Sequence, residues 1–405
     1  MNSELQWIKK AIEDLAVTAV REDGTYWRAT YTPEDEKGVR LLQSWLEEKG
    51  FTTYFDAVGN LFGRIEGNTE AVVLAASHRD TVKDGGKYDG ALGILTAIEA
   101  LSALTREYGK PQKTVEVAAL CEEEATRFLS GFIGSRAITG ELTDSDLEQK
   151  DDEGVTVREA ISAAGYFHGA LPRKRTDIEH VVELHIEQGA VLENREKKVG
   201  LVTSIVGITA GHIVFCGQQN HAGTTPMSMR SDPTAAAADL ISHMLAWAKA
   251  KEDRLVCTFG NIKVEPGKSN IIPGRIDLMF DLRASEQELI DEGKAEMEAF
   301  LSVLSQRGDN VSGRIEYFAD DPPAELDPAG LSALRQLADE AGYSYLEMPS
   351  GAGHDSQIFA VHYATNMVFL PSHRGISHAP AEYTDIDAAA EGYELYKKFL
   401  HYLAW

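Results

Sequence analysis

Cysteine is scarce, basic residues are outnumbered, and long apolar runs are missing. The three cysteines, Cys121, Cys216 and Cys257, lie far apart and lack the paired spacing of metal or disulfide sites. This favours a reducing compartment and argues against a fold held by disulfides. Lysine and arginine number 39 against 64 acidic residues, a formal net charge of −25 that opposes binding to DNA, RNA or other polyanions.

Targeting and nucleotide-binding signatures are missing too. No apolar run approaches the length of a membrane span, and Met1–Ala16 predicts an amphipathic helix without the basic start and apolar core of a signal peptide. Neither a Walker phosphate loop nor a GxGxxG motif is present. These absences predict a cytoplasmic protein with no nucleic-acid or membrane partner.

The pattern of apolar residues predicts an α/β fold with a mixed, mainly parallel sheet covered by helices. The length of 405 residues suits two or three domains, and 43% apolar residues suffice for a real core. Strands and helices alternate, which favours parallel strands. Expected helices are Leu5–Ala16, Pro33–Lys49, Gly90–Tyr108, Val157–Ala164, Pro328–Ala341 and Ile386–Leu403; expected strands are Phe51–Phe55, Leu61–Ile65, Ala71–Ser77, Thr114–Cys121, Val181–Ile186 and Asn366–Leu370; Thr143–Glu153 is expected to be loop.

A different pattern begins near Gly207. From Gly211 to about Asp320 the order is β-α-β-β-α-β, typical of a ferredoxin-like α+β unit that can be inserted into a larger fold. We therefore expect a discontinuous domain of residues 1–208 and 321–405, interrupted by a second domain of residues 209–320. After the first strand, the expected elements are the helix Asp232–Lys251, strands Leu255–Val264 and Arg275–Arg283, the helix Glu286–Gln306 and the strand Arg314–Phe318.

The stretch His78–Asp89 is the first with chemical character. It follows a buried strand and precedes a helix, so His78, Asp80 and Asp89 lie on a loop at the carboxyl end of a strand, where α/β sheets carry their sites. Imidazole and carboxylate are ligands that divalent metals prefer. The alternative is a polar surface loop that happens to contain a histidine.

Two further stretches add carboxylates. Glu122-Glu123-Glu124 ends an apolar strand, and a cation would relieve the crowding of like charges. If the segment is extended, successive side chains point opposite ways, so one glutamate could bind metal while its neighbour faces a bound water. The alternative is an exposed acidic turn. Glu183, His185 and Glu187 share one strand face, which favours a metal site over a satisfied core histidine.

Four loops complete the inventory. Asn220–Pro226 contains His221, and Gly267–Gly274 contains Asn270 and leads into a strand that ends at Arg283. An asparagine and an arginine on neighbouring elements could grip a carboxylate, although ordinary turns and a surface arginine are the alternative. Ser350–Asp355 and Gly375–Glu382 place His354 and His378 in small-residue loops. The count of histidines and carboxylates indicates metal rather than nucleotide.

Together these motifs resemble the M20-type metallohydrolases, and within them the hydantoinase/carbamoylase branch. That branch contains N-carbamoyl-L-amino acid hydrolases, β-ureidopropionases and allantoate amidohydrolases. The matching stretches cover nearly the whole chain in order. They are Ser77–Gly90, Glu122–Phe128, Glu183–Gly189, Asn220–Arg230, Ser269–Arg283, Ser350–Asp355 and Gly375–Glu382.

The resemblance implies a metallopeptidase-like catalytic domain that holds two divalent ions, such as zinc, manganese, cobalt or nickel. It implies His78, Asp89 and His185 around one ion. It implies Asp89, Glu124 and His378 around the other, with Asp89 as the bridge. Asp80 would orient His78, and Glu123 would be the general base.

The resemblance also assigns roles outside the metal ligands. The inserted domain would be a lid through which a homodimer forms, and its residues His221, Asn270 and Arg283 would reach the substrate. His221 would act catalytically, as an oxyanion donor, on the partner subunit's site. Gln188 and His354 match further substrate-binding positions.

Two residues depart from the branch's pattern. Ala125 stands where glycine is common, so it is either strained at positive φ or adopts an ordinary φ that was always tolerated. Arg79 is bulkier and more basic than the usual apolar residue, and it either points away from the pocket or alters it.

The resulting prediction is hydrolysis of the ureido C–N bond of allantoate or an N-carbamoyl-L-amino acid, with release of ammonia and carbon dioxide. Allantoate is preferred on the resemblance of Phe55–Gly67 and Ser350–Ala360. One alternative is an aminoacylase or dipeptidase that uses the same metals. The other is a non-catalytic binding protein, which need not retain all the expected ligands.

Overall fold

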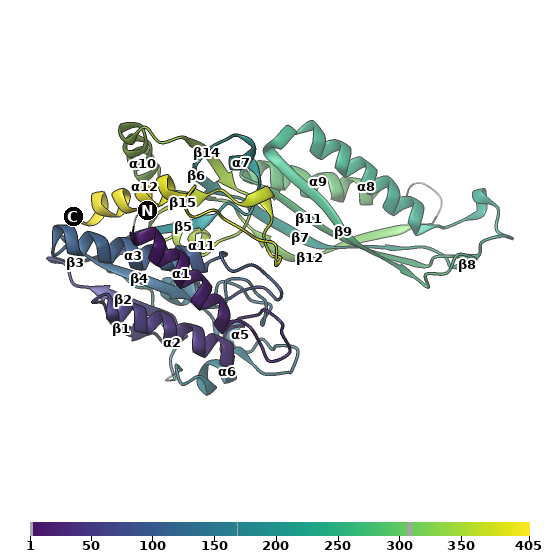
Figure 1. The fold of residues 1–405 in the computed structure, drawn as a ribbon. Coiled ribbons are helices and arrows are strands. Elements are labelled where there is room, and N and C mark those ends of the chain that lie inside the picture. The colour runs from purple at the N-terminus through teal and green to yellow at the C-terminus, as the bar shows by residue number, and fades with distance from the viewer. Residues whose placement is uncertain (1–2, 168, 305, 307–309) are drawn as a thin grey trace. The chain divides into compact units, whose positions relative to one another are not determined.

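A computed structural model describes residues 3–167, 169–304, 306 and 310–405. Of the predicted elements, Met1–Ala16 and Glu286–Gln306 include residues 1–2 and 305, which lie outside the described part. The chain forms two compact units, one of residues 1–203 with 325–405 and one of residues 204–324 (Figure 1). The predicted limits of 209 and 320 fall inside the smaller unit. Among the described residues, no helix is long and apolar enough to cross a membrane.

The larger unit is built on a nine-stranded mixed sheet whose four central strands are parallel. The order is β1-β2-β4-β3-β5-β15-β6-β13, with β14 also paired to β6, and β4, β3, β5 and β15 run in one direction. This confirms the predicted mixed α/β fold. The strands are β1 (Thr52–Phe55), β2 (Leu61–Ile65), β3 (Thr69–His78), β4 (Lys113–Leu120), β5 (Ile178–Ile186), β6 (Val199–Ile205), β13 (Ala324–Glu325), β14 (Tyr345–Ser350) and β15 (Ala364–Leu370).

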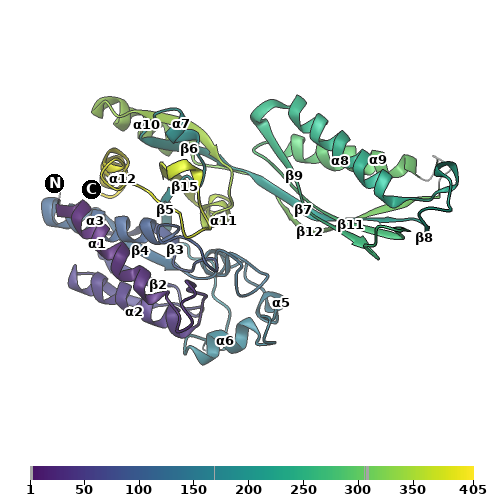
Figure 2. The same ribbon diagram turned by 45° about the vertical axis from the view of Figure 1, so that its right-hand side comes forward.

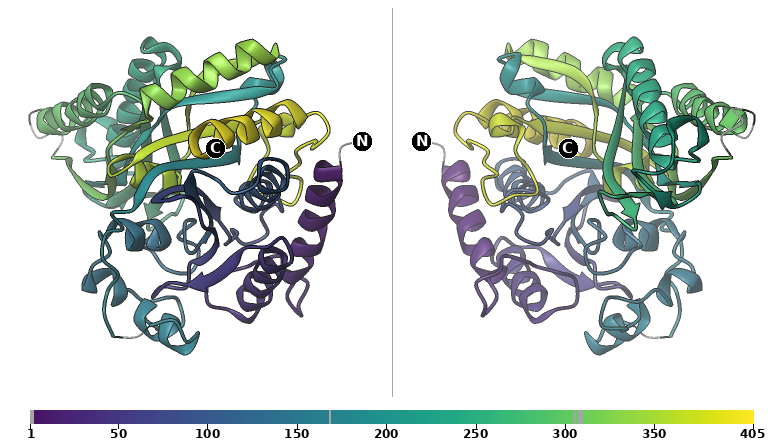
Figure 3. Two further views of the ribbon diagram at one scale, coloured as in Figure 1. Left: turned by 90° about the vertical axis from the view of Figure 1, so that its left-hand side faces the viewer. Right: turned by 90° about the vertical axis from the view of Figure 1, so that its right-hand side faces the viewer.

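Both faces of this sheet are buried, which explains the continuous apolar runs in its strands. In β3, Val73 and Ala75 join the core under one set of helices, while Val72 and Leu74 join the core on the other face. Figure 2 and the opposite views of Figure 3 show the helices around the sheet. The first set is α1 (Ser3–Thr18), α2 (Pro33–Glu48), α3 (Ala91–Tyr108), α10 (Pro328–Ala341) and α12 (Ala390–Ala404); α4 (Ile133–Thr139) and α11 (Asp355–Ala360) contribute to the other face.

Most predicted elements are present, but the prediction that Thr143–Glu153 is loop was wrong in part. It contains the helix α5 (Asp144–Leu147), closed by a capping box in which Thr143 and Asp146 exchange side-chain-to-backbone hydrogen bonds. Four residues are too few to show helical periodicity. The predicted helix near Val157 is α6 (Val157–Ala163), and α7 (Val191–Asn194) is another four-residue helix that periodicity did not reveal.

The smaller unit contains a four-stranded antiparallel sheet in the order β12-β7-β11-β9. Two helices, α8 and α9, lie on one face of it (Figures 1 and 2) and share its apolar core. The elements follow the expected β-α-β-β-α-β order. They are β7 (Gly207–Cys216), α8 (Pro233–Ala250), β9 (Leu255–Glu265), β11 (Arg275–Ala284), α9 (Gln287–Leu304) and β12 (Ser312–Asp321), with a small ladder of β8 (Asn220–His221) and β10 (Ile271–Ile272) and the 3₁₀ turns η1 (Met227–Met229) and η2 (Glu252–Arg254).

A buried ion pair fastens the start of α2 to the loop after β3. The Arg79 guanidinium donates from Nε and Nη2 to the two carboxylate oxygens of Asp35, at 2.7 and 3.1 Å, and from Nη1 to the carbonyls of Gly59 and Ala119. Neither Arg79 nor Asp35 is more than 2% exposed. Removing one partner would leave the other charge buried without compensation.

We therefore expect Arg79→Met to lower the free energy of unfolding by about 3–5 kcal/mol, measured by urea denaturation of the larger unit's transition. Arg40→Ala is the matched control, because the Arg40–Glu36 pair is about half exposed on each side and should be worth less than ~1 kcal/mol. Equal effects of the two substitutions would contradict a stabilising role for the buried pair.

Candidate metal centre

Three side chains converge at the carboxyl ends of β3 and β5. His78 is the last residue of β3, His185 is in β5, and Asp89 ends the loop before α3. Asp89 Oδ1 lies 3.3 Å from His78 Nε2 and 3.1 Å from His185 Nε2. The two imidazole Nε2 atoms are 3.5 Å apart. All three side chains are at least 95% buried, so water cannot mediate these contacts freely.

Backbone carbonyls fix which nitrogen of each imidazole faces this point. His78 Nδ1 lies 3.1 Å from the carbonyl oxygen of Asp80, and His185 Nδ1 lies 2.9 Å from that of Ile186. A carbonyl only accepts, so both Nδ1 atoms donate and both Nε2 lone pairs point toward Asp89 Oδ1. That oxygen is buried and receives no hydrogen bond of good geometry among the described residues. Three acceptors facing one another fit a divalent cation.

A second group shares Asp89. His378 Nε2 lies 3.2 Å from Asp89 Oδ2 and 3.4 Å from Glu124 Oε1. Within the described chain, Glu124 Oε1 is another buried oxygen that accepts no hydrogen bond. The Gln188 amide nitrogen donates to Asp89 Oδ2 at 2.9 Å and lies 3.2 Å from His378 Nε2. Asp89 therefore offers one oxygen to each group, and both donor sets suit borderline divalent metals.

Positive charge is required at both groups. Burial alone would lower the pKa of His78, but the carboxylates of Glu123 and Asp89 outweigh it and raise that pKa well above its usual range. The adjacent carboxylates of Asp89 and Glu124 raise the pKa of His378 to about 10. A metal that binds these nitrogens must therefore compete with protons.

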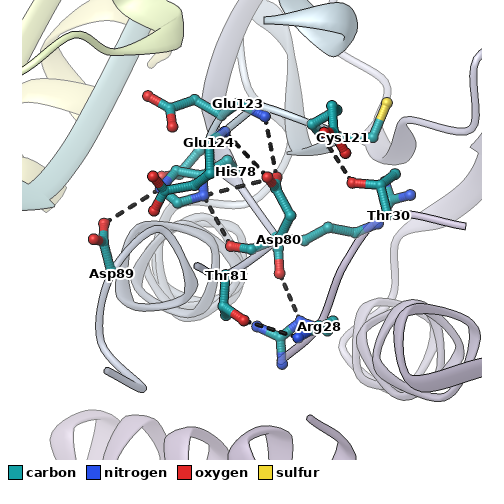
Figure 4. Close-up of polar contacts among 12 residues, drawn as sticks. Arg28, Thr30, His78, Asp80, Thr81, Asp89, Cys121, Glu123 and Glu124 are labelled. Atoms are coloured by element: carbon teal, nitrogen blue, oxygen red, sulfur yellow. Dashed lines mark hydrogen bonds and ion pairs between the residues drawn. The ribbon is translucent and has the colours of Figure 1, made fainter. Parts of the chain in front are cut away.

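The three glutamates after β4 form a turn, so the interpretation as an extended segment was wrong. Glu122 has φ +54°, and its buried Oε1 accepts the backbone N–H groups of Arg127 and Phe128. Asp80 accepts the N–H groups of Glu123 and Glu124 at 3.2 and 3.1 Å (Figure 4). Its carboxylate lies 3.8 Å from His78 Nδ1, so the Asp80 carbonyl makes the closer contact with that ring.

Glu123 differs from its neighbours. Its backbone is held by Asp80, while its side chain points away from Asp80 (Figure 4). Glu123 forms a candidate ligand group with His78 and Glu124. Burial raises the pKa of Glu123 well above its usual range, which suits a carboxylate that accepts a proton and returns it.

The other polar residues around β5 are held by the protein itself. Glu183 accepts hydrogen bonds from Ser77 and Ser356. Glu187 caps α7 by accepting the N–H groups of Val191 and Leu192, so it does not join the metal groups as its spacing had suggested. The ring of His354 packs edge-on against His185 at 4.6 Å, and burial lowers the pKa of His354 well below its usual range.

His221, Asn270 and Arg283 all belong to the smaller unit. His221 is paired with Ile271 in the β8–β10 ladder, next to Asn270. Its Nδ1 accepts the N–H groups of Gly223 and Thr224 at 3.0 and 3.2 Å, so the neutral ring carries its proton on Nε2. Arg283 lies in β11 and donates to Asp281 at 2.8 and 3.0 Å.

The two departures from the branch's pattern are now explained. Arg79 points away from the metal groups and into its pair with Asp35. Ala125 has φ +50°, so the alternative of an ordinary φ was wrong. An alanine in the left-handed region costs about 1 kcal/mol relative to a favoured conformation, which explains why glycine suits this turn.

Comparison with known families agrees with this geometry. The model of peptidase family M20/M25/M40 matches residues 66–402. The chain belongs to this family. The prediction of an M20-type chain is therefore confirmed, and the mainly parallel sheet flanked by helices is the fold expected of it.

Several relatives align with this chain over nearly its whole length. Allantoate amidohydrolase of Bacillus subtilis (strain 168) is 38% identical over 97% of this chain and 96% of its own length. N-carbamoyl-L-amino-acid amidohydrolase of Paenarthrobacter aurescens is 35% identical over the same shares. A hydantoinase/carbamoylase family amidase from Burkholderia multivorans superposes with a TM-score of 0.91, at 29% identity over 98% and 97% of the two chains. The predicted branch and the predicted hydrolase class are confirmed.

Two carboxylates near these groups could not be predicted from the sequence. Glu122 stands within an acidic run, and Glu382 stands at the end of the motif Gly375–Glu382. Glu382 is buried and accepts hydrogen bonds from the backbone of Tyr88 and Asp89. Nothing in its spacing distinguishes it from a surface glutamate, because its partners lie 293 and 294 residues away.

Because a metal must compete with protons for the imidazole nitrogens, metal loading should release protons. Calorimetric titration with Co²⁺ at pH 7 in two buffers of different ionisation enthalpy should give different observed enthalpies, with affinity falling as the pH falls. His78, His185 and His378 all have raised pKa values, so the release should be present across the neutral range. Identical enthalpies in both buffers would contradict this assignment.

Proposed function

We propose that this chain hydrolyses the ureido C–N bond of a ureido acid, with allantoate as the preferred substrate and N-carbamoyl-L-amino acids as the related class. Water adds to the ureido carbonyl carbon, the bond to the substituted nitrogen breaks, and the amine leaves. The carbamate that remains decays to ammonia and carbon dioxide. Relatives with both names match 97–99% of this chain: an allantoate amidohydrolase at 38% identity, and an allantoate amidohydrolase and an N-carbamoyl-L-amino acid amidohydrolase at 36% each.

The observation that carries the proposal is the pair of acceptor groups that share Asp89, with Glu123 beside them. We assign one divalent ion to His78, Asp89 and His185, and a second to Asp89, Glu124 and His378. Two bound ions would lower the pKa of a water and polarise the ureido carbonyl. A ureido group resists hydrolysis because two nitrogens donate into its carbonyl, so such activation is needed.

Glu123 would act as the general base. Its carboxylate would take a proton from the attacking water and deliver it to the departing nitrogen. Its raised pKa supports this role, because a carboxylate with an ordinary pKa would hold the proton too weakly to return it. Asp80 would support it by holding the backbone N–H groups of Glu123 and Glu124.

Residues of the smaller unit would bind the substrate. Arg283 of one chain and Asn270 of the partner subunit would hold the substrate carboxylate, because within one smaller unit the two lie at opposite ends of the sheet. A guanidinium binds a carboxylate through two parallel hydrogen bonds. His221 would donate from Nε2 to the oxygen that becomes negative during attack, and the fixed tautomer supports this role. By the family resemblance, Gln188 and His354 would also be substrate-binding residues, and the smaller unit would be a lid.

The spacing within the smaller unit supports a homodimer. Arg283 pairs with Ile208 at one end of the sheet, whereas His221 and Asn270 lie beyond the opposite end, past Cys216 and Arg275. The eight residue-to-residue steps from Ile208 to Cys216 extend about 26 Å. One small ureido acid cannot span that length, so Arg283 and His221 of one chain would serve two different sites.

The direct test of function is an ammonia-release screen with the metal-reconstituted protein. Allantoate and N-carbamoyl-L-amino acids are compared with N-acetyl amino acids and dipeptides at equal concentration. The proposal predicts ammonia from the ureido acids and no free amino acid from the other substrates. Release of amino acid from acyl or peptide substrates alone would identify an aminoacylase or dipeptidase instead.

Replacing Glu123 by Gln should lower kcat by about 10²–10⁴-fold, because the amide cannot accept the proton of the attacking water. Metal content should stay the same, since the backbone contacts to Asp80 do not involve the changed group. Glu124→Gln is the contrasting variant and should lose metal. Normal turnover by Glu123→Gln would refute the assignment of the base.

Co-expression of Glu123→Gln and His221→Asn chains with different tags should restore part of the activity that each variant lacks alone. The mixed dimer would hold one site with an intact Glu123 and an intact His221 from the partner. If His221 acts within its own chain, no mixed dimer can recover activity. A purified mixed dimer without activity would therefore contradict the shared site.

A further inference from the structure

Glu382 lies four residues after His378 and makes three hydrogen bonds. Its Oε1 accepts the backbone N–H groups of Tyr88 and Asp89 at 3.0 and 3.1 Å. Its Oε2 accepts the hydroxyl of Ser377 at 2.7 Å. The side chain is only 5% exposed. Burying a carboxylate costs free energy, and the three hydrogen bonds offset that cost. They can do so only while the loops hold the three donors in these positions.

The three donors belong to two distant loops that carry candidate metal ligands. Tyr88 and Asp89 end the loop between β3 and α3, and Ser377 precedes His378 in the loop after β15. The Ser377 hydroxyl also lies 3.3 Å from Asp89 Oδ2. One carboxylate therefore joins the backbone of the bridging aspartate to the residue beside the imidazole of the second group.

Backbone packing shows that the first loop closes directly on this carboxylate. A Cβ atom at Gly86 would lie 2.0 Å from Glu382 Oε1 and 2.4 Å from Glu382 Cβ, so only glycine fits there. His378 has φ +54°, a conformation that is unfavourable for a residue with a side chain. Such a conformation persists only where neighbouring contacts hold it.

We propose that Glu382 is a positioning residue that holds Asp89 and the His378 loop in register, so that tight binding of both metal ions depends on it. This inference rests on the proposed dinuclear function. Glu382 acts through the Asp89 backbone and through Ser377, not through contact with substrate. Its loss would loosen two things together: the Asp89 carboxylate that both ions would share, and the His378 imidazole of the second ion.

The test measures Co²⁺ binding and the visible absorption spectrum of the bound ions for Glu382→Ala, Glu382→Gln and the wild type. Glu382→Ala should weaken Co²⁺ binding by about 10–100-fold and shift the absorption bands. Glu382→Gln should restore most of the affinity, because its amide oxygen can still accept the N–H groups of Tyr88 and Asp89. If Glu382→Gln recovers the Co²⁺ affinity, metal binding requires the hydrogen bonds that residue 382 accepts and does not require its negative charge.

Glu187→Ala is the matched control. Glu187 is also buried, lies two residues from His185, and accepts two backbone N–H groups, but these belong to α7. It should lose stability without changing the Co²⁺ spectrum. Should Glu382→Ala not fold, Glu382→Asp replaces it, since the shorter chain cannot reach both loops and should give a partial loss of affinity.

Wild-type spectrum and affinity in both Glu382→Ala and Glu382→Asp would overturn the proposal, as would equal spectral changes in Glu187→Ala. These results would leave the dinuclear site itself intact. Failure of the wild-type chain to bind Co²⁺ is a different outcome, and it would overturn the proposed function together with this inference.

Discussion

The site depends on one electrostatic constraint: several hydrogen-bond acceptors face one another, and hydrogen bonds cannot satisfy all of them. Asp89 Oδ1 and the Nε2 atoms of His78 and His185 lie within 3.5 Å of each other, while carbonyls on the far side of both rings fix the Nδ1 donors. Only positive charge stabilises that arrangement in a buried place. Protons or divalent ions must supply it, which is why the nearby carboxylates raise the pKa values of His78 and His185.

The sheet explains why these atoms meet. Strands β4, β3, β5 and β15 are parallel neighbours, so their carboxyl ends lie along one edge. The loops and turns at that edge carry His78 and Asp89, the glutamates after β4, His185 with Gln188, and His378. Open α/β sheets bind their ligands at this edge. The carboxylates of Asp80 and Glu382 then join loops that come from different strands.

The predictable part of the structure is the part governed by local pattern. The buried run Ala71–Ser77 corresponds to β3, and the helical spacing from Gly90 to Tyr108 corresponds to α3. Because neighbouring parallel strands end at the same edge of the sheet, His78 is expected near Glu122–Glu124. What the pattern misses depends on contacts far apart in sequence or on the backbone itself. The backbone turn at Glu122 has a positive φ, and the direction of the Arg79 side chain is explained only by its ion pair with Asp35. The Glu187 side chain caps α7, a helix too short to predict.

Metal analysis of an Asp89→Ala variant, after reconstitution and removal of free ions, tests the shared carboxylate most directly. The wild-type chain should retain two divalent ions and His378→Ala one. Asp89→Ala should retain neither at an affinity near that of the wild type, because both groups lose their common ligand. Two tightly bound ions in Asp89→Ala would contradict the account.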